Sequence, residues 1–439
     1  MGSESLRAMA VETGFRKRTS KLTPEVFFDL MFYASSLSEN SSLERLVTYL
    51  QSRYGIEMRK QSLDERFTEK AISFVKTVLS RLIREQFSDM LYCEDFLSAF
   101  NHVRIKDSTK FIVPDNLASH FRGNGGSGDI SSAGISIQYE FDLKTGEFLD
   151  LTLTEAVRND QRDAKETAEN VCKNDLIIRD LGYFSTAVLQ KIGSKEAFFL
   201  SRLHTAATVY DESDVEIDFK KLRIFMTENG IERLDKQVFI GKEERLPVRL
   251  VLGLVPPEVY RERLRRKQKE EKRRGRQMKE RTKLLLYFNL FVTNVEAKDL
   301  PSEKIMPLYR FRWQAELMFK NWKSVFSIHK LQKMKYERYI CMLYVRLILI
   351  VVNLQIVNRV QSVLSKQGER KDILSYRKAL QTLKTGFGEI LNILRESLKK
   401  ATKLLGEIYR ILSENHWRER RKKRENYVEN ICLFICVSE

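Results

Sequence analysis

The chain has few of the side chains from which soft-metal centres and disulfide frameworks are built. Its 439 residues include five cysteines, which are scattered and form no CxxC pair. This usage argues against a zinc ribbon and against a disulfide-stapled secreted protein, and it favours a reducing cytoplasm. The five histidines are equally dispersed, without an HxxxH pair, so we expect no histidine-based metal site.

A long uninterrupted apolar run is also missing. Residues 1–20 lack the apolar core of a signal peptide. The most apolar stretch, 340–357, is interrupted by Arg346, Asn353 and Gln355. A membrane span needs about 20 mostly apolar residues, and an arginine within it is costly. We therefore interpret 340–357 as a buried core helix and expect no membrane association.

Acidic residues are too few to balance the basic ones. The chain has 77 Lys and Arg against 59 Asp and Glu, which gives a net charge of +18. The stretches 261–283 and 417–424 are especially basic. Such an excess favours a polyanionic partner, either nucleic acid or an anionic membrane surface, and with a membrane disfavoured we expect nucleic acid. The hydrophobic content of 43% is enough for real cores, so we expect several folded units.

The hydrophobic pattern of the first hundred residues is helical. Residues 43–50 have the spacing of one helix face, and Gly55 interrupts the pattern. Ser62 and Glu65 then form a capping-box signature ahead of a second amphipathic helix. Two helices around a short turn resemble a helix-turn-helix, and a plain helical bundle is the alternative.

From about residue 100 the period changes to two, which predicts strands. We expect a strand over 103–107 that ends at its acidic residue, a hairpin over 135–151, and a short strand over 176–180. Further strand-type patterning covers 195–255, and a buried strand is expected over 284–295. The pattern is then helical to about residue 413.

One predicted helix, 308–323, carries a polar stripe. With 3.6 residues per turn, Tyr309, Arg312, Glu316 and Lys323 fall within roughly 60° of arc on one face. Another face, about 120° away, is predicted to be buried and consists of Phe311, Ala315, Met318, Trp322 and Val325. A carboxylate among cations suits a divalent metal beside bound phosphates, whereas a solvated face with ion pairs is the alternative.

The spacing Tyr-x2-Arg-x3-Glu-x6-Lys, formed by Tyr309, Arg312, Glu316 and Lys323, resembles the YREK signature of bacterial insertion-sequence DDE transposases. The similarity covers most of the chain and is strongest from about residue 100 to about residue 350. It implies a DNA strand cleavage and joining enzyme that binds the terminal inverted repeats of an insertion sequence.

Two further segments resemble the family's aspartate motifs. The segment 104–109 resembles the strand of the first aspartate, which would be Asp107. The segment 180–184 resembles the second motif and begins with Asp180. Asp180 is preferred over Asp175, because Asp175 precedes the predicted strand.

The resemblance implies a mixed α/β fold, with a ribonuclease-H-like catalytic core interrupted by a β-rich insertion. The two aspartates would lie on neighbouring strands and the glutamate on a helix. The expected units are a helical DNA-binding domain at 1–98, the first part of the core at 99–194, the β-rich insertion with its basic segment at 195–290, the second part of the core at 291–365, and a helical dimerisation region at 366–439.

The resemblance also assigns roles to the site residues. Catalysis and metal binding would fall to Asp107, Asp180 and Glu316, holding two Mg²⁺ ions, or Mn²⁺ in their place, about 3.5 to 4 Å apart. DNA phosphates would be held by Tyr309, Arg312 and Lys323. A homodimer would join two transposon ends and insert them into chromosomal or plasmid DNA. The alternatives are a regulator descended from a transposase and a structure-directed nuclease or resolvase of the same fold.

Overall fold

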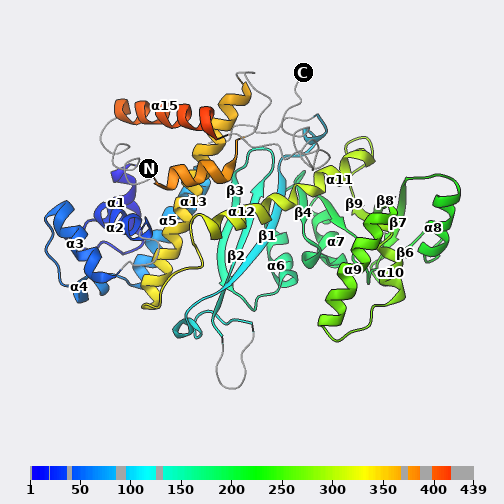
Figure 1. The fold of residues 1–439 in the computed structure, drawn as a ribbon, viewed down its shortest axis with the longest axis horizontal. Helices are drawn as coiled ribbons and strands as arrows, with labels where there is room; N and C mark the ends of the chain where they lie inside the picture. The colour runs from blue at the N-terminus through cyan, green and yellow to red at the C-terminus, as the bar shows by residue number, and fades with distance from the viewer. Residues whose placement is uncertain are drawn as a thin grey trace.

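A nine-stranded mixed sheet runs through the centre of the protein (Figure 1). The computed structural model describes residues 2–18, 20–36, 42–85, 95–124, 132–366, 374–385 and 398–416. The strand order is β3-β2-β1-β4-β5-β9-β8-β7-β6. The N-terminal helices gather beyond the β3 end of the sheet, and the segment that contains β6 to β8 forms the opposite end. This is the mixed α/β architecture that the sequence predicts.

The first half of the sheet surrounds the candidate site. It consists of β1 (Val103–Ile112), β2 (Gly134–Asp142), β3 (Phe148–Glu155), β4 (Leu176–Arg179) and β5 (Phe198–Arg202). β1 pairs antiparallel with β2 and parallel with β4, and β4 pairs parallel with β5. The predicted hairpin is confirmed as β2 and β3, and the predicted short strand as β4. The prediction that the first strand ends at Asp107 is wrong, because pairing with β2 carries β1 on to Ile112.

The second half of the sheet contains β6 (Val209–Tyr210), β7 (Arg233–Ile240), β8 (Leu246–Leu254) and β9 (Phe288–Thr293). β9 pairs antiparallel with both β5 and β8, so the strands expected in the β-rich insertion continue the core sheet. The strand expected over 284–295 begins only at Phe288, because the residues before it form α10 (Glu280–Leu285). Helix α8 (Phe219–Glu228) interrupts the region without having been predicted.

The basic stretch expected over 261–283 begins in a long surface helix. Helix α9 (Pro257–Arg273) starts with proline at its first turn, where the missing N–H costs nothing. Every side chain on α9 is exposed or half-buried. The second basic stretch, 417–424, lies outside the described residues.

Five helices form the N-terminal region: α1 (Ser3–Glu12), α2 (Pro24–Ser36), α3 (Leu43–Tyr54), α4 (Lys60–Asp64) and α5 (Glu69–Arg84). α3 ends, as expected, at Gly55, whose φ of 64° is the left-handed conformation that glycine adopts without strain. The capping-box prediction is wrong, because Ser62 lies inside α4. The cap of α5 is Thr68, whose side chain accepts a hydrogen bond from the amide of Ala71.

The long helix α13 (Tyr336–Lys366) joins the N-terminal helices to the rest of the fold by packing against α5 and α2. Within it, 336–364 is long and apolar enough to cross a membrane, but 83% of its most apolar window is buried inside the protein. Arg346 is accommodated because its guanidinium donates to the carbonyls of Ser327 and Lys330. The interpretation of 340–357 as a buried core helix is therefore confirmed.

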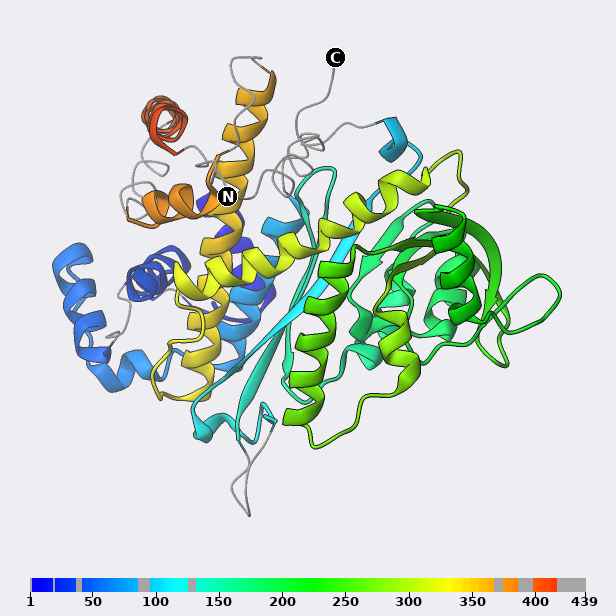
Figure 2. The same ribbon diagram turned by 45° about the vertical axis from the view of Figure 1, so that its right-hand side comes forward.

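Helices cover both faces of the sheet. α12 (Arg312–Ser324) runs across β1 (Figure 2), whereas α11 (Ser302–Arg310) contacts β5, and the buried side chains of both helices belong to the larger hydrophobic core. α6 (Asp160–Thr167) and α7 (Thr186–Ser194) pack with a second core that includes β7 to β9. α15 (Leu398–Asn415) contacts α13. The expected single helix over 308–323 is thus divided at Phe311, and its predicted buried face is confirmed for Phe311, Ala315, Trp322 and Val325.

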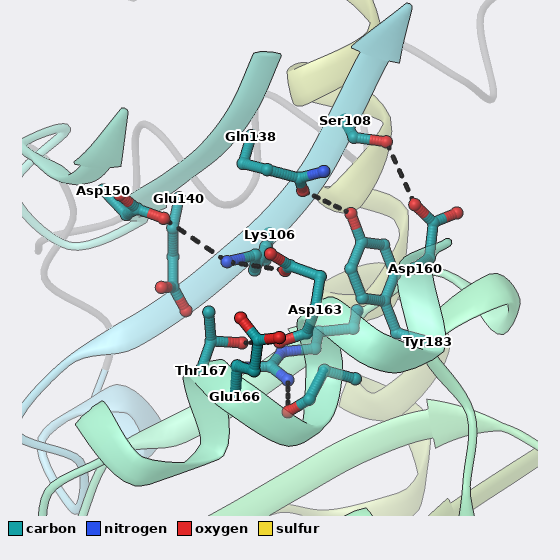
Figure 3. Close-up of polar contacts among 12 residues, drawn as sticks. Lys106, Ser108, Gln138, Glu140, Asp150, Asp160, Asp163, Glu166, Thr167 and Tyr183 are labelled. Atoms are coloured by element: carbon teal, nitrogen blue, oxygen red, sulfur yellow. Dashed lines mark hydrogen bonds and ion pairs between the residues drawn. The ribbon is translucent and has the colours of Figure 1, made fainter. Parts of the chain in front are cut away.

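A layer of ion pairs lies beneath β1. Val103 and Ile105 point into the larger core, so alternation turns Arg104 and Lys106 to the opposite face. The fully buried Lys106 ammonium lies 2.9 Å from a carboxylate oxygen of Asp163 and 3.4 Å from one of Asp150 (Figure 3). The Arg104 guanidinium also holds Glu140 through two hydrogen bonds of 3.0 and 3.2 Å. These pairs tie α6 and the β2–β3 hairpin to β1.

Asp163→Ala is expected to destabilise the protein by about 3 to 5 kcal/mol, because it leaves the Lys106 ammonium buried without its nearest counter-charge. Denaturant unfolding measures the effect. Glu166→Ala on the same helix is the matched control, and because its ion pairs are exposed to solvent we expect a much smaller loss of stability. Equal stability of the two variants would contradict this account of the ionic layer.

Candidate active site

Asp107 and Asp180 occupy adjacent positions at one edge of the β1–β4 pairing. The parallel register runs from Val103 opposite Leu176 to Lys106 opposite Arg179. The next residue on each side is therefore one of the two aspartates. Asp180 directly follows β4 and leads into the single turn 181–183. The sheet thus brings together two residues that the sequence predicts as site aspartates.

Glu316 joins the two aspartates through Arg312. Arg312 and Glu316 both lie on α12, one helical turn apart, and the Arg312 guanidinium lies 2.8 Å from a Glu316 oxygen. The same guanidinium lies 3.1 Å from an Asp107 oxygen and 3.4 Å from an Asp180 oxygen. One cation therefore contacts three carboxylates that come from β1, from the end of β4 and from α12.

These side chains line a pocket of about 330 Å³. Its other lining residues are Ser108, Thr109, Phe319, Lys320 and Lys323. The side chains of Asp180 and Glu316 are 45% and 40% exposed, so both carboxylates can reach a ligand in the pocket. The Lys323 ammonium donates to the carbonyl of Lys110 at 3.2 Å, and burial lowers its pKa. The pocket therefore combines three carboxylates with a basic wall.

Tyr309 interacts with the Arg312 side chain but, unlike the other three signature residues, does not line the pocket. It lies on α11, before the break at Phe311, and only 7% of it is exposed. Its hydroxyl donates to the main-chain carbonyl of Arg179 at 3.3 Å, and its ring packs on Phe291. This hydrogen bond fixes the last residue of β4, directly before Asp180.

The carboxyl group of Asp107 has an unusual proton affinity. Burial raises its pKa to about 6, against the pull of the Ser108 amide and the Arg312 guanidinium. The nearby charges of Asp180 and Glu316 raise it further. For Arg312, burial opposes the charged form, but Asp180 and Glu316 outweigh burial and raise the pKa of the guanidinium.

The three carboxylates suit a hard divalent cation in their chemistry, because they offer oxygen ligands only. Among the described residues, however, no group of three histidine, cysteine or acidic side chains converges closely enough to hold one ion. The Arg312 guanidinium lies between the three carboxylates and neutralises part of their charge. The donor chemistry of the acids thus suits a hard cation, and in this structure the three acids interact with the Arg312 guanidinium.

The sequence did not reveal a second group of residues that supports the two aspartates. The Ser108 hydroxyl donates to an Asp160 oxygen at 3.3 Å, and the Tyr183 hydroxyl donates to Gln138 at 3.2 Å (Figure 3). Gly182 packs so closely on α6 that a Cβ there would lie 3.0 Å from an Asp160 oxygen. The sequence signal for this contact was Gly182 itself, because a glycine directly after a strand marks a place where the backbone approaches another segment closely.

Comparison with known proteins agrees with this geometry. The family model of the transposase DDE domain matches residues 99–353, more than half of the chain. The transposase for insertion sequence element IS231B of Bacillus thuringiensis subsp. berliner is 29% identical over 437 residues, which cover 96% of this chain and 90% of that protein. The transposase for IS231F of Bacillus thuringiensis subsp. israelensis is 30% identical, covering 96% of this chain and 91% of that protein.

A more distant relative is the transposase for IS1151 of Clostridium perfringens, which is 26% identical over 83% of this chain and 80% of that protein. The sheet, the acidic pocket and the matched domain define a protein with a transposase DDE domain. The chain belongs to the DDE transposases of bacterial insertion sequences. Enzymes of this family generally use divalent metal ions, in agreement with the oxygen-only donor set.

DNA cleavage is expected to fall as the pH drops through about 6, because the Asp107 carboxyl takes up its proton there and loses its charge. Initial cleavage rates between about pH 5 and about pH 8 measure the midpoint. Raising the Mg²⁺ concentration should move the midpoint to lower pH, since metal and proton compete for one carboxylate. A midpoint near the ordinary aspartate value of about 4 at every Mg²⁺ concentration would contradict the assignment.

Proposed function

We propose that this transposase binds the terminal inverted repeats of its insertion sequence, cleaves DNA strands there and transfers them into target DNA. The supporting observation is the meeting of Asp107, Asp180 and Glu316, from three distant segments, in one pocket with a basic wall. In cleavage, the oxygen of a water attacks phosphorus and the bond to the 3′ oxygen breaks. In transfer, the oxygen of the released 3′-hydroxyl attacks the phosphorus of a target phosphodiester, and the bond from that phosphorus to the target's own 3′ oxygen breaks.

Asp107, Asp180 and Glu316 are proposed as the catalytic carboxylates and as the ligands of Mg²⁺, with Mn²⁺ as a substitute. When bound, such ions activate the attacking oxygen and stabilise the leaving oxygen. The contribution of the protein is to hold the acids on a sheet edge and one helix, where strand pairing fixes their spacing. The contact of Arg312 with all three supports the proposal, since a single positive charge already interacts with the three acids together.

The DNA-binding roles are proposed for Arg312, Lys323 and Tyr309. A guanidinium released from the acids can hold a phosphate by two hydrogen bonds, and Lys323 adds a point charge on the same helix. Tyr309 has little exposed surface, and its hydroxyl is hydrogen-bonded to the carbonyl of Arg179. These observations favour a role in positioning Asp180, the next residue, over direct contact with a DNA phosphate. Lys320, which also lines the pocket, is a further cation for the DNA backbone.

A ribonuclease-H-like core is proposed for the five strands β3-β2-β1-β4-β5. Its support is the central β1, with an antiparallel hairpin on one side and parallel strands on the other. The two aspartates lie on neighbouring strands, as this fold requires. The five sequence-based domains remain proposals as well.

A homodimer is proposed for the complex with two transposon ends, in the cytoplasm and on chromosomal or plasmid DNA. Exposed apolar side chains on α15, Leu405 and Ile411, support a contact surface in the C-terminal region. Residues 367–373, at the start of the expected dimerisation region, lie outside the described residues.

Glu316→Gln is expected to lower Mg²⁺-dependent cleavage of the element's own termini by at least about 100-fold, because one metal-binding charge is lost. DNA binding should remain, since removing a negative charge does not weaken phosphate contacts. Labelled terminal fragments incubated with wild type and variant measure both properties. Glu166→Gln, an exposed carboxylate change on α6, is the control and should cut like wild type.

Wild-type binding without cleavage or strand transfer would favour a regulator instead. Cleavage that does not depend on the inverted repeats would favour a structure-directed nuclease. Unchanged cleavage by Glu316→Gln would remove Glu316 from the site.

A further inference from the structure

A second cavity, of about 610 Å³, lies in the N-terminal region, away from the carboxylates. It is formed where the connection between α1 and α2 meets the start of α5. Five cationic side chains line it: Arg16, Lys17, Arg18, Arg66 and Lys70. Glu65 is the acidic residue of the wall. The cavity therefore concentrates positive charge on a concave surface.

Within the parts of the chain that the structure describes, the cations of this cavity are not neutralised by acidic side chains. Among the described residues, no ion pair is formed by any of the five. Elsewhere in the same region, Arg7 pairs with Glu25 and Lys60 with Glu44. Lys17 and Lys70 even contact each other, and this contact lowers the pKa of Lys70. Two like charges side by side are unfavourable unless an anion joins them.

Backbone geometry holds this arrangement. Gly14 has a φ of 67°, so the chain turns sharply after α1 and carries Arg16 and Lys17 toward α5. The aliphatic part of Lys70 packs 3.6 to 3.7 Å from the position that a Cβ on Gly14 would occupy. A residue other than glycine would be strained at this turn.

The cavity is also attached to the helix that follows the candidate active site. The Lys335 ammonium donates to the carbonyl of Phe67 at 3.0 Å, and Arg338 pairs with Asp64 at 2.9 Å. Both cations lie at the start of α13, which follows α12 in the chain. A ligand in the cavity would therefore be held in a fixed relation to Glu316.

We propose that this cavity is a binding site for the phosphate backbone of the DNA whose end lies in the catalytic pocket. Double-stranded DNA carries one negative charge per about 1.7 Å of its axis, which matches unpaired cations on a concave wall. Because phosphate contacts carry no base sequence, the site contributes affinity and register, not recognition of the inverted repeat. The inference rests on the proposed function, since it assumes that DNA is the substrate.

The test measures DNA binding by the full chain without Mg²⁺, for a duplex with the element's terminus and for a scrambled duplex. Lys17→Gln/Lys70→Gln should weaken binding of both duplexes by at least about tenfold and lower the slope of log K against log salt by about 2. Lys76→Gln is the matched control, because Lys76 is an exposed lysine of the same helix outside the cavity lining. It should bind like wild type.

A second variant separates charge from folding. Lys17→Arg/Lys70→Arg keeps both charges and should retain the wild-type salt slope. Unchanged affinity and slope in the double glutamine variant would overturn the proposal, as would an equal loss in Lys76→Gln. Wild-type protein that binds DNA but does not cut it would overturn only the proposed function, because the salt slope still tests the cavity.

Discussion

Three carboxylates close together repel one another, and in this protein one guanidinium compensates for that repulsion. Arg312 contacts Asp107, Asp180 and Glu316 at 3.1, 3.4 and 2.8 Å. The three acids come from a strand, a strand end and a helix, so no local pattern could assemble them. In the proposed function, a metal ion replaces Arg312 between the three acids, and Arg312 then holds a DNA phosphate.

The rest of the fold makes that arrangement rigid. The β1–β4 register places the two aspartates, and the buried pairs of Lys106 and Arg104 hold α6 and the hairpin beneath them. Tyr309 secures the main chain before Asp180. α12 is held over β1 by Trp322, which is fully buried. The charged layer costs desolvation energy, but it leaves few ways to shift the strand that carries Asp107.

Much of this arrangement could be predicted because it depends on local patterns. Period-two alternation indicated the β2–β3 hairpin, and the apolar face of α12 was identified from 3.6-residue spacing. The division of the signature helix at Phe311 could not be seen, because 308–323 has continuous helical spacing. The ionic layer could not be predicted either, because its partners Lys106 and Asp163 are far apart in the sequence and each has the pattern of a surface charge. Long-range packing alone decides such features.

The most direct test of the central claim is to locate the metal site in solution. Fe²⁺ bound in place of Mg²⁺ reduces added hydrogen peroxide to hydroxide and a hydroxyl radical, becoming Fe³⁺, and the radical cuts the protein backbone near the ion. With an element-end duplex bound, we expect cuts near residues 107, 180 and 316 together, suppressed by excess Mg²⁺. Cuts at other positions, or cuts that Mg²⁺ does not suppress, would show that the three acids do not form one metal site.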